Sequence, residues 1–300
     1  AADRERLARQ LGLDKPIHIQ YLYWLIGNDW TKADLDGDGI AETPGARKGV
    51  LRGDFGMSMV NRGKSVLEVI GERLPNTLIL MLTAEFVIIV GSLIVGIFSA
   101  LRQYSLLDNL VTAISFVGYS MPIFFIALVS MYIFAVNFKR WNLPYLPTVG
   151  MFDPAVGQTP LQVLWHLILP VFSISFISLA AYSRYIRSTM LEVMSQDYIR
   201  TAKSKGLARR EVIFIHALKN ASLPLVTIVG LDLPLLLGGA VVTERIFAWP
   251  GMGRLFLDHV SRNDIPVVMG ILMLIAVAVV VFQILTDITY AWLDPRIRYE

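Results

Sequence analysis

Long apolar runs separated by polar segments dominate the chain from residue 77 onward. Five of them reach the length of about 20 residues with which a helix crosses the hydrocarbon core of a bilayer. These runs are Leu78–Leu101, Leu110–Val136, Val163–Tyr182, Leu223–Val242 and Ile265–Leu285, with a continuation of the last toward Leu293. A helix of a soluble core would be shorter and would carry a polar stripe. The pattern therefore predicts an all-α membrane protein, a polytopic helical bundle with five visible spans.

The composition agrees with a lipid environment. Of the 300 residues, 55% are hydrophobic and 17% are charged, whereas soluble proteins have about 45–50% and about 25%. The chain has no cysteine, which excludes disulfides, thiolate metal sites and cysteine nucleophiles. Its net charge of +3 is too small to indicate a nucleic-acid partner. The placement of the charges is therefore more informative than their sum.

Basic residues beside the spans predict the side on which each loop lies. The segment Ser183–Ser222 holds eight basic and three acidic residues, so we expect it in the cytoplasm, together with the tail 294–300. Residues 1–76 then form an extracytoplasmic segment and residues 77–293 form the transmembrane domain. Because Ala1 is not a start methionine and no signal-peptide pattern is present, we expect a preceding transmembrane helix, which makes six spans in the full protein.

Residues 195–206 of the cytoplasmic loop predict a short amphipathic helix with an apolar edge and a basic rim. Gly206 stands where such a helix would end in a left-handed cap. A helix of this kind often lies on anionic lipid headgroups. The acidic residues Asp197 and Glu211 interrupt the basic face and favour a docking helix for a cytosolic partner instead. The candidate docking residues are Asp197, Tyr198, Arg200, Ala202, Lys203 and Gly206.

The same loop resembles a family signature. The run from Gln196 to Leu207, followed by His216–Ala221 and Pro224, is similar to the signature loop of binding-protein-dependent ABC transporter permeases of the dipeptide and oligopeptide branch. The similarity covers the whole chain apart from an insertion near residues 29–49. The other motifs that carry it are Leu11–Pro16, Gln20–Tyr21, Arg52–Gly56, Glu72–Pro75, Gly238–Glu244, Phe247–Gly253 and Leu293–Arg296. Their order and spacing carry the resemblance, rather than any single motif.

The resemblance implies a type I ABC importer-like fold in the cytoplasmic (inner) membrane of a prokaryote. This chain would enclose a pathway with a second permease subunit, two cytosolic ATP-binding subunits would hydrolyse ATP, and an extracytoplasmic solute-binding protein would deliver the cargo. The helix in residues 195–206 would lie in a cleft of an ATPase. Gly63-Lys64-Ser65 resembles the end of a phosphate-binding loop, but Ser58 replaces its required first glycine, so we expect no nucleotide on this non-catalytic chain.

Peptides are the cargo that this branch implies. An oligosaccharide or a nickel complex could cross the same architecture, because members of the branch resemble one another more than their cargoes do. A secondary transporter or channel that works without ATP is the alternative from a different class. An ATPase that co-purifies through residues 195–206 would separate the first two hypotheses from the third.

Acidic residues inside the predicted spans are candidates for the pathway, because a charge at mid-bilayer costs at least about 2.5–3.5 kcal/mol. Asp232 lies between Gly230 and Pro234, so we expect a kinked or broken helix there. Such a carboxylate could line a cavity, or it could pin two helices together. Glu85 is the second pathway candidate.

The acidic insertion at residues 29–49 has the oxygen-ligand spacing of a Ca²⁺ loop, with carboxylates at positions 1, 3, 5 and 9, Gly at 6 and a backbone carbonyl at 7. The candidate ligands are Asp34, Asp36, Asp38, the carbonyl of Ile40, and Glu42. Gly45 occupies position 12, where a bidentate Glu would complete the site, so we expect weak binding. A solvated acidic turn is the alternative.

Overall fold

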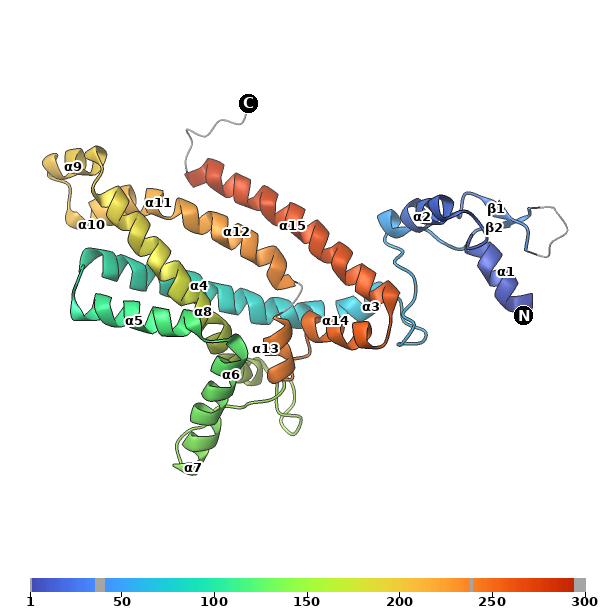
Figure 1. The fold of residues 1–300 in the computed structure, drawn as a ribbon, viewed down its shortest axis with the longest axis horizontal. Helices are drawn as coiled ribbons and strands as arrows, with labels where there is room; N and C mark the ends of the chain where they lie inside the picture. Colours follow the sequence, from blue (N-terminus) through green and yellow to red (C-terminus); the bar gives the residue numbers. More distant parts are fainter. Residues whose placement is uncertain (1, 36–40, 238–239, 294–300) are drawn as a thin grey trace. The chain divides into compact units, whose positions relative to one another are not determined.

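The computed structural model describes residues 2–35, 41–237 and 240–293, which form two compact units. The first unit comprises the chain up to Glu72 together with Asp258–Leu272, and the second comprises Arg73–Leu257 and the chain from Met273 onward. The described residues are mostly helical, and their only sheet is one antiparallel pair of two-residue strands (Figure 1). This agrees with the predicted all-α class.

The described elements follow one another along the chain, with irregular segments at residues 53–65 and 141–159. Those of the first segment are α1 (Ala2–Gln10), α2 (Ile17–Ile26), β1 (Lys32–Ala33), β2 (Thr43–Pro44), the 3-10 helix η1 (Val50–Arg52) and α3 (Val66–Gly71). Next come α4 (Leu74–Leu101), α5 (Leu106–Ser120), α6 (Ile123–Met131), the π-helix η2 (Tyr132–Asn137), α7 (Phe138–Arg140) and α8 (Pro160–Met194). The last are α9 (Asp197–Ser204), α10 (Arg209–Glu211), the π-helix η3 (Val212–Ala217), α11 (Leu218–Ala221), α12 (Leu223–Leu237), α13 (Val241–Ile246), α14 (Met252–Ser261) and α15 (Ile265–Leu293).

Buried polar contacts fix the loops of the first unit. Asn28 is 2% exposed, donates from Nδ2 to the Gln10 carbonyl at 2.9 Å and accepts at Oδ1 from the Arg47 amide at 2.9 Å. Asp264, directly before α15, is fully buried and accepts from Ser58 Oγ at 2.5 Å and from two backbone amides at 3.1 Å. Burial opposes ionisation of this carboxyl, but the hydrogen bonds outweigh it and hold the pKa of Asp264 below its usual range.

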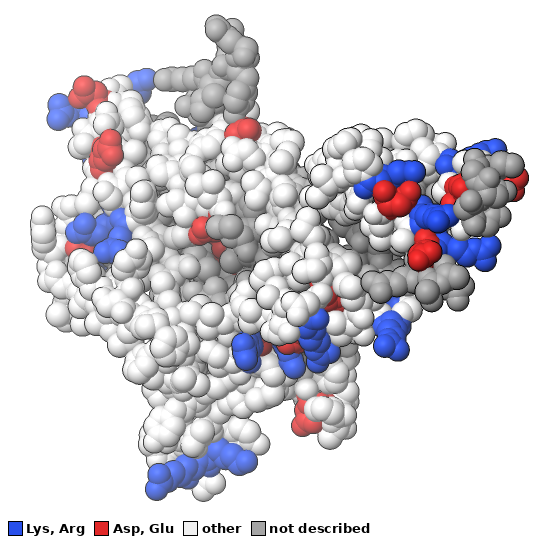
Figure 2. Space-filling view, turned by 45° about the vertical axis from the view of Figure 1, so that its right-hand side comes forward, with Lys and Arg blue, Asp and Glu red and all other residues white. Residues whose placement is uncertain are grey.

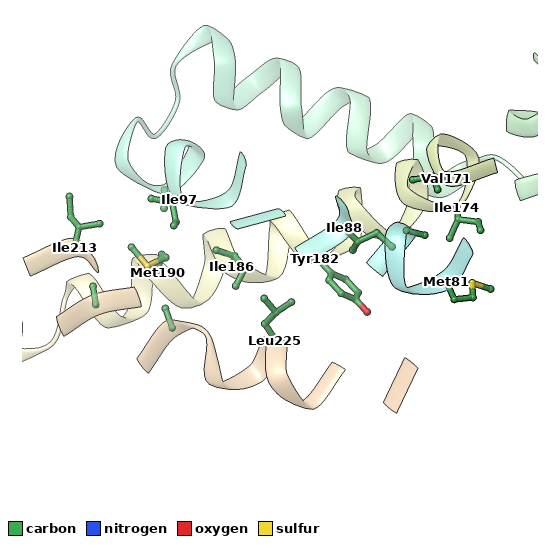
Figure 3. Close-up of a cluster of buried hydrophobic side chains, with 14 of the residues drawn as sticks. Met81, Ile88, Ile97, Val171, Ile174, Tyr182, Ile186, Met190, Ile213 and Leu225 are labelled. Carbon is green, nitrogen blue, oxygen red and sulfur yellow. The ribbon is translucent and has the colours of Figure 1, made fainter. Parts of the chain in front are cut away.

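Helices α4 and α8 form the centre of the second unit. The side chains labelled in Figure 3 come from α4 (Met81, Ile88, Ile97), α8 (Val171, Ile174, Tyr182, Ile186, Met190), η3 (Ile213) and α12 (Leu225). A Cβ on Gly96 of α4 would come within 2.7 Å of Ile186 Cβ and 2.8 Å of the Ser183 carbonyl, so only glycine permits this approach. Because lipid tails are as apolar as these side chains, close packing rather than removal from water stabilises the contact.

Four helical stretches of the described chain are long and apolar enough to cross a membrane: Val66–Leu101, Ile123–Arg140, Pro160–Met194 and Ile265–Trp292. A fifth span results if Arg209–Ala221 and Leu223–Leu233, which meet at a bend of 47°, count as one. The apolar runs predicted within α4, α8 and α15 are confirmed as helices. α8 continues past the predicted end of its span at Tyr182 to Met194, so its last turns belong to the segment that we expect in the cytoplasm.

The predicted run Leu110–Val136 is divided into two helices. α5 ends at Ser120, α6 begins at Ile123, and Met121 between them is extended with φ −96° and ψ 135°. Pro122 explains the break, because proline lacks an amide donor and disfavours the helical conformation of the residue before it. The run Leu223–Val242 is also divided, between α12 and α13.

A broad face of the helices carries almost no charged side chain (Figure 2). Large apolar side chains such as Phe86, Ile94, Phe98 and Ile284 are more than half exposed. Half of the most apolar stretch of α8 is buried, compared with 17% of that of α15. α8 is therefore a central helix of its unit, whereas α15 presents most of its surface to lipid or to another subunit.

Candidate functional site in the α9 segment and an intramembrane acidic cluster

The helix predicted in residues 195–206 is present as α9, and its apolar edge faces the chain itself. Ile199 is fully buried and Ala202 is 7% exposed, and both belong to the core that includes η3. The Asn220 side chain adds a polar contact by donating to Tyr198 Oη at 3.1 Å. Ala202 is one of the predicted docking residues, and it lies on this edge. The structure instead uses it to anchor α9, because an apolar edge this close to η3 is buried most readily there.

The opposite side of α9 holds the charged candidates. The side chains of Asp197 and Arg200 are 97% and 81% exposed, and their charged groups are 3.9 Å apart. Lys203 is also exposed, and Tyr198 is 44% exposed. An ion pair in this setting contributes little stability. These side chains are therefore available to a partner.

Gly206 ends α9 as the sequence predicts. Its φ is +77°, in the left-handed region, which confirms the predicted cap. A Cβ at this position would meet no atom within 4 Å. A side chain at Gly206 would therefore act through backbone strain and not through a clash.

The structure brings together the two pathway candidates, Glu85 on α4 and Asp232 on α12. Tyr182 of α8 donates a hydrogen bond from Oη to Asp232 Oδ2. Glu85 lies close enough for its charge to interact with Asp232 and with Tyr182. Because α4, α8 and α12 contact one another, three helices converge on two carboxyl groups. We call Glu85, Tyr182 and Asp232 the acidic cluster.

The two carboxyl groups of the acidic cluster have different surroundings. Glu85 is 4% exposed, and its Oε1 is enclosed without a hydrogen-bond partner among the residues that the structure describes. Asp232 is half-buried and accepts from Tyr182. A buried acceptor without a donor is costly and uncommon in native structures. Glu85 is therefore the member of the cluster that most needs an explanation.

The backbone at Asp232 is helical, without the local break that the sequence offered as one possibility. α12 is continuous from Leu223 to Leu237, past both Asp232 and Pro234. The 47° bend lies upstream, at the junction with α11, where Pro224 occupies the first turn of α12. A proline in a first turn costs no hydrogen bond but prevents the preceding helix from running through. α12 is therefore unbroken at Asp232, and a kink there remains a prediction.

Only the two ends of the acidic insertion are described. Asp34 is half-buried and Glu42 is exposed, whereas Asp36, Asp38 and Ile40 lie outside the described residues. The strands β1 and β2 pair Ala33 with Thr43 and so join the two ends as a hairpin. In the described ranges, no group of three or more His, Cys, Asp or Glu side chains could hold a metal ion. The calcium site remains a prediction.

The sequence patterns do not predict the ion pair between Arg187 and Asp108, whose carboxylate is buried. Arg187 of α8 donates from Nε and Nη2 to the two carboxylate oxygens of Asp108, both at 2.8 Å. The side chain of Asp108 is 3% exposed and also accepts from the Tyr104 amide at 2.9 Å. This contact ties the turn between α4 and α5 to α8. The two residues are 79 positions apart, so no local pattern could have paired them.

The structure gives a physical reason for the motif around Phe247–Gly253. The fully buried Glu244 accepts from Thr77 Oγ1 at 2.8 Å and from the Arg254 amide at 2.9 Å. It thereby caps the first turn of α14, and its burial raises its pKa. A Cβ on Gly251 would come within 2.3 Å of the Glu244 carboxylate, so the glycine makes room for the cap. The motif therefore has a structural role, which is to hold the turn between α13 and α14 around the buried Glu244.

These features define a class of protein, a multi-pass helical membrane protein with an anchored helix that presents a charged rim and with carboxyl groups between its spans. The chain belongs to the family described as binding-protein-dependent transport system inner membrane components, whose model matches residues 92–299. This confirms the resemblance stated from the motifs. The protein is therefore a multi-pass protein of the inner membrane.

Curated relatives and one solved structure agree with this assignment. The chain is 41% identical to the oligopeptide transport system permease protein AppB of Bacillus subtilis (strain 168), over 99% of this chain and 86% of that protein. It is 36% identical to the dipeptide transport system permease protein DppB of Escherichia coli (strain K12), over 98% of this chain and 85% of that protein. A chain of the MetNI methionine ABC transporter, solved in inward-facing conformations, has a TM-score of 0.57 at 15% identity and covers 76% of this chain and 97% of its own length. The fold is thus that of a type I ABC importer permease.

Proposed function

We propose that this chain is the transmembrane permease subunit of an ATP-driven importer of peptides. The relatives named for oligopeptides and dipeptides match almost its whole length, which supports peptides as the cargo. The observation that carries the proposal is the geometry of α9. Its apolar edge is fixed to the core through Ile199 and Ala202, while Asp197, Arg200 and Lys203 remain exposed to a partner.

In this proposal the chain works within an assembly. It forms a heterodimer with a second permease subunit, and the translocation pathway lies between the two. Two cytosolic ATP-binding subunits hydrolyse ATP, so the chain itself is not an enzyme. Residues 1–76 face the extracytoplasmic solute-binding protein, and the α9 segment faces the ATPases.

Coupling follows from the way in which α9 is anchored. Closure of the ATPases on ATP would move the exposed rim formed by Asp197, Arg200 and Lys203. Because Ile199 is packed in the same core as η3, that movement would carry η3 with it. η3 leads through α11 into α12, the helix that holds Asp232. The motion would thus reach the acidic cluster as a rigid-body shift of packed helices.

The acidic cluster is the proposed part of the pathway in this chain. Carboxyl groups inside a membrane are retained where they pair or face a polar cavity. Glu85 and Asp232 come from different helices that contact each other and lie within electrostatic range, which supports a shared role better than two separate structural roles. Pinning of α8 to α12 through Tyr182 and Asp232 is the competing explanation for Asp232.

The acidic insertion is proposed to bind Ca²⁺ weakly through Asp34, Asp36, Asp38, the Ile40 carbonyl and Glu42. The hairpin formed by β1 and β2 supports this by joining the two ends of the loop. Extracellular sites of this kind bind at about 10⁻⁴ to 10⁻³ M, so the ion would order the loop without signalling. Calorimetry on the intact complex should show Ca²⁺ binding in that range. A titration that shows no heat of binding would rule out the proposed site.

Reconstitution of the whole complex in proteoliposomes tests the proposed function. With its two ATPases and its binding protein, the complex should take up alanyl-phenylalanine only when ATP is supplied. If the complex takes up an oligosaccharide or a nickel complex in place of the dipeptide, the proposed cargo is wrong but the proposed importer architecture stands. Uptake that proceeds without ATP or ATPases would favour the secondary transporter instead.

A further inference from the structure

The acidic cluster contains an acceptor that the described residues do not use. Glu85 is 96% covered, yet its Oε1 receives no hydrogen bond from any described group. It lies within electrostatic range of Asp232, and two neighbouring ionised carboxylates repel each other unless a cation lies between them or one of them takes up a proton. A cationic occupant that carries N–H groups would relieve this repulsion and would also supply the donor that Glu85 Oε1 lacks.

The acceptors of the cluster match one kind of cation. A primary ammonium group has three N–H donors and no acceptor. Glu85, Asp232 and the Tyr182 hydroxyl supply one oxygen acceptor each, and the hydroxyl can still accept while it donates to Asp232. A metal ion such as Ca²⁺ takes six to eight oxygens, and the described residues hold no third carboxylate or histidine beside this pair. The donor count thus favours an ammonium group over a metal.

An apolar cavity lies one helical turn from the carboxyl groups. It has a volume of about 250 Å³, and its lining includes Ile89 of α4, Val229, Gly230 and Leu233 of α12, and Phe282 of α15. Ile89 follows Glu85 by one turn on α4, and Val229 and Leu233 flank Asp232 on α12. The volume suits one or two amino-acid residues rather than a larger ligand.

From this geometry we infer that the acidic cluster binds the amino-terminal ammonium group of a peptide, and that the cavity beside it receives an apolar side chain of the same peptide. The inference rests on the proposed function and adds to it a named contact for the cargo. Glu85 and Asp232 hold the charge, and Tyr182 fixes the orientation of Asp232. Desolvation of the site strengthens each of these contacts.

Protection of Glu85 from chemical modification tests this site in the assembled complex. A hydrophobic carbodiimide modifies carboxyl groups enclosed in a membrane protein, and mass spectrometry can follow the labelling of Glu85. Alanyl-phenylalanine should slow that labelling by at least about tenfold, since a hydrogen bond to a charged group is among the strong ones. Propanoyl-phenylalanine, the same molecule without its amino group, should slow it less than about twofold.

Two variants make the test specific. Asp232→Asn should abolish the protection by alanyl-phenylalanine, because it removes half of the negative charge. Asp287→Asn is the matched control, since Asp287 is also a carboxyl group in a spanning helix but accepts from Gln283 instead. It should leave the protection intact.

Equal protection by the two molecules would overturn the inference, because binding would then depend on the cavity alone. Glu85 that is never labelled, or is labelled equally fast with and without the dipeptide, would also overturn it. Failure of the proposed function looks different, since the wild-type complex would then not take up alanyl-phenylalanine with ATP. Normal ATP-driven uptake together with an unprotected Glu85 would reject only the ammonium site.

Discussion

The α9 segment and the acidic cluster place charge in opposite ways. In α9 the apolar side chains are buried and the charges of Asp197 and Arg200 lie in the open. In the acidic cluster the charges of Glu85 and Asp232 lie between apolar helices. An exposed charge costs little and is free to meet a protein partner, whereas an enclosed one needs a compensating group. The comparison thus separates a surface for docking from a site for a ligand.

Two ion pairs, one largely buried and one exposed, extend this comparison to the stability of the protein. The largest effect is expected from Asp108→Ala, which leaves Arg187 without the carboxylate that it contacts twice at 2.8 Å. Removing one partner of a buried pair costs about 3–5 kcal/mol, and because the Arg187 side chain is 27% exposed, the lower end of this range is expected. The matched control is Asp197→Ala, whose partner is 3.9 Å away and exposed, with an expected cost of less than about 1 kcal/mol. Thermal unfolding of the purified complex should show this difference, and equal shifts for the two variants would break the comparison.

Asp264 is a buried carboxylate held by hydrogen bonds, with the His259 ring 3.7 Å away, and its replacement should have an effect between these limits. Asp264→Asn replaces one acceptor oxygen with a donor that faces donors, at a cost of about 1–3 kcal/mol. Because the folded-state pKa of Asp264 is lowered, its contribution is fully present above the ordinary value of about 3.9 and is lost as pH falls through the folded value.

Unfolding measured at neutral pH and again below about pH 4 checks both parts of the Asp264 prediction. The wild type should lose stability on acidification that the Asp264→Asn variant has already lost at neutral pH. A variant that acidification affects as strongly as the wild type would assign the loss to other groups.

Gly206→Val should uncouple transport with a smaller effect on stability. A left-handed backbone costs a residue with a side chain about 1–2 kcal/mol, and valine is among the least tolerant residues. The end of α9 would therefore shift, and ATP-driven uptake should fall by at least about tenfold at equal amounts of inserted protein. Gly206→Asn is the control, because asparagine tolerates this conformation. Normal uptake by the valine variant would show that the turn is not needed for coupling.

The smallest effect is expected at the exposed rim. Arg200→Ala should weaken association with the ATPase by less than about 1 kcal/mol, and added salt should diminish the difference from wild type. Complex recovery at several salt concentrations measures this. Unchanged recovery at low salt would count against a contact at Arg200.

The sequence could predict features whose causes are local. The end of α9 depends on one glycine and on cap chemistry within a single turn, and Gly206 has the predicted positive φ. The apolar runs in α4, α8 and α15 are helices because nothing within them interrupts the apolar pattern strongly enough to end a helix. The break at Pro122 also has a local cause, but the continuous apolar pattern on both sides concealed it.

Features that depend on tertiary contacts could not be predicted in the same way. The pattern of α9 showed that it has an apolar edge, but not that η3 would cover Ile199 and Ala202. Glu85 and Asp232 each stood out as charges within spans, yet only the packing of α4, α8 and α12 brings them together. Local sequence patterns therefore identify residues that need a partner, but only the tertiary structure shows which partner each residue has.

The central claim is that the exposed rim of α9 docks on a cytosolic ATPase while its apolar edge stays with this chain. Because the chain has no cysteine, Lys203→Cys carries its only thiol, and a cross-linker attached there can report what lies against the rim. The matched control is Asp153→Cys, an exposed position in the loop between α7 and α8, on the side where the binding protein is expected. In the assembled complex, Lys203→Cys should capture the ATPase and Asp153→Cys should not. Capture of the ATPase from both positions, or from neither, would contradict the account.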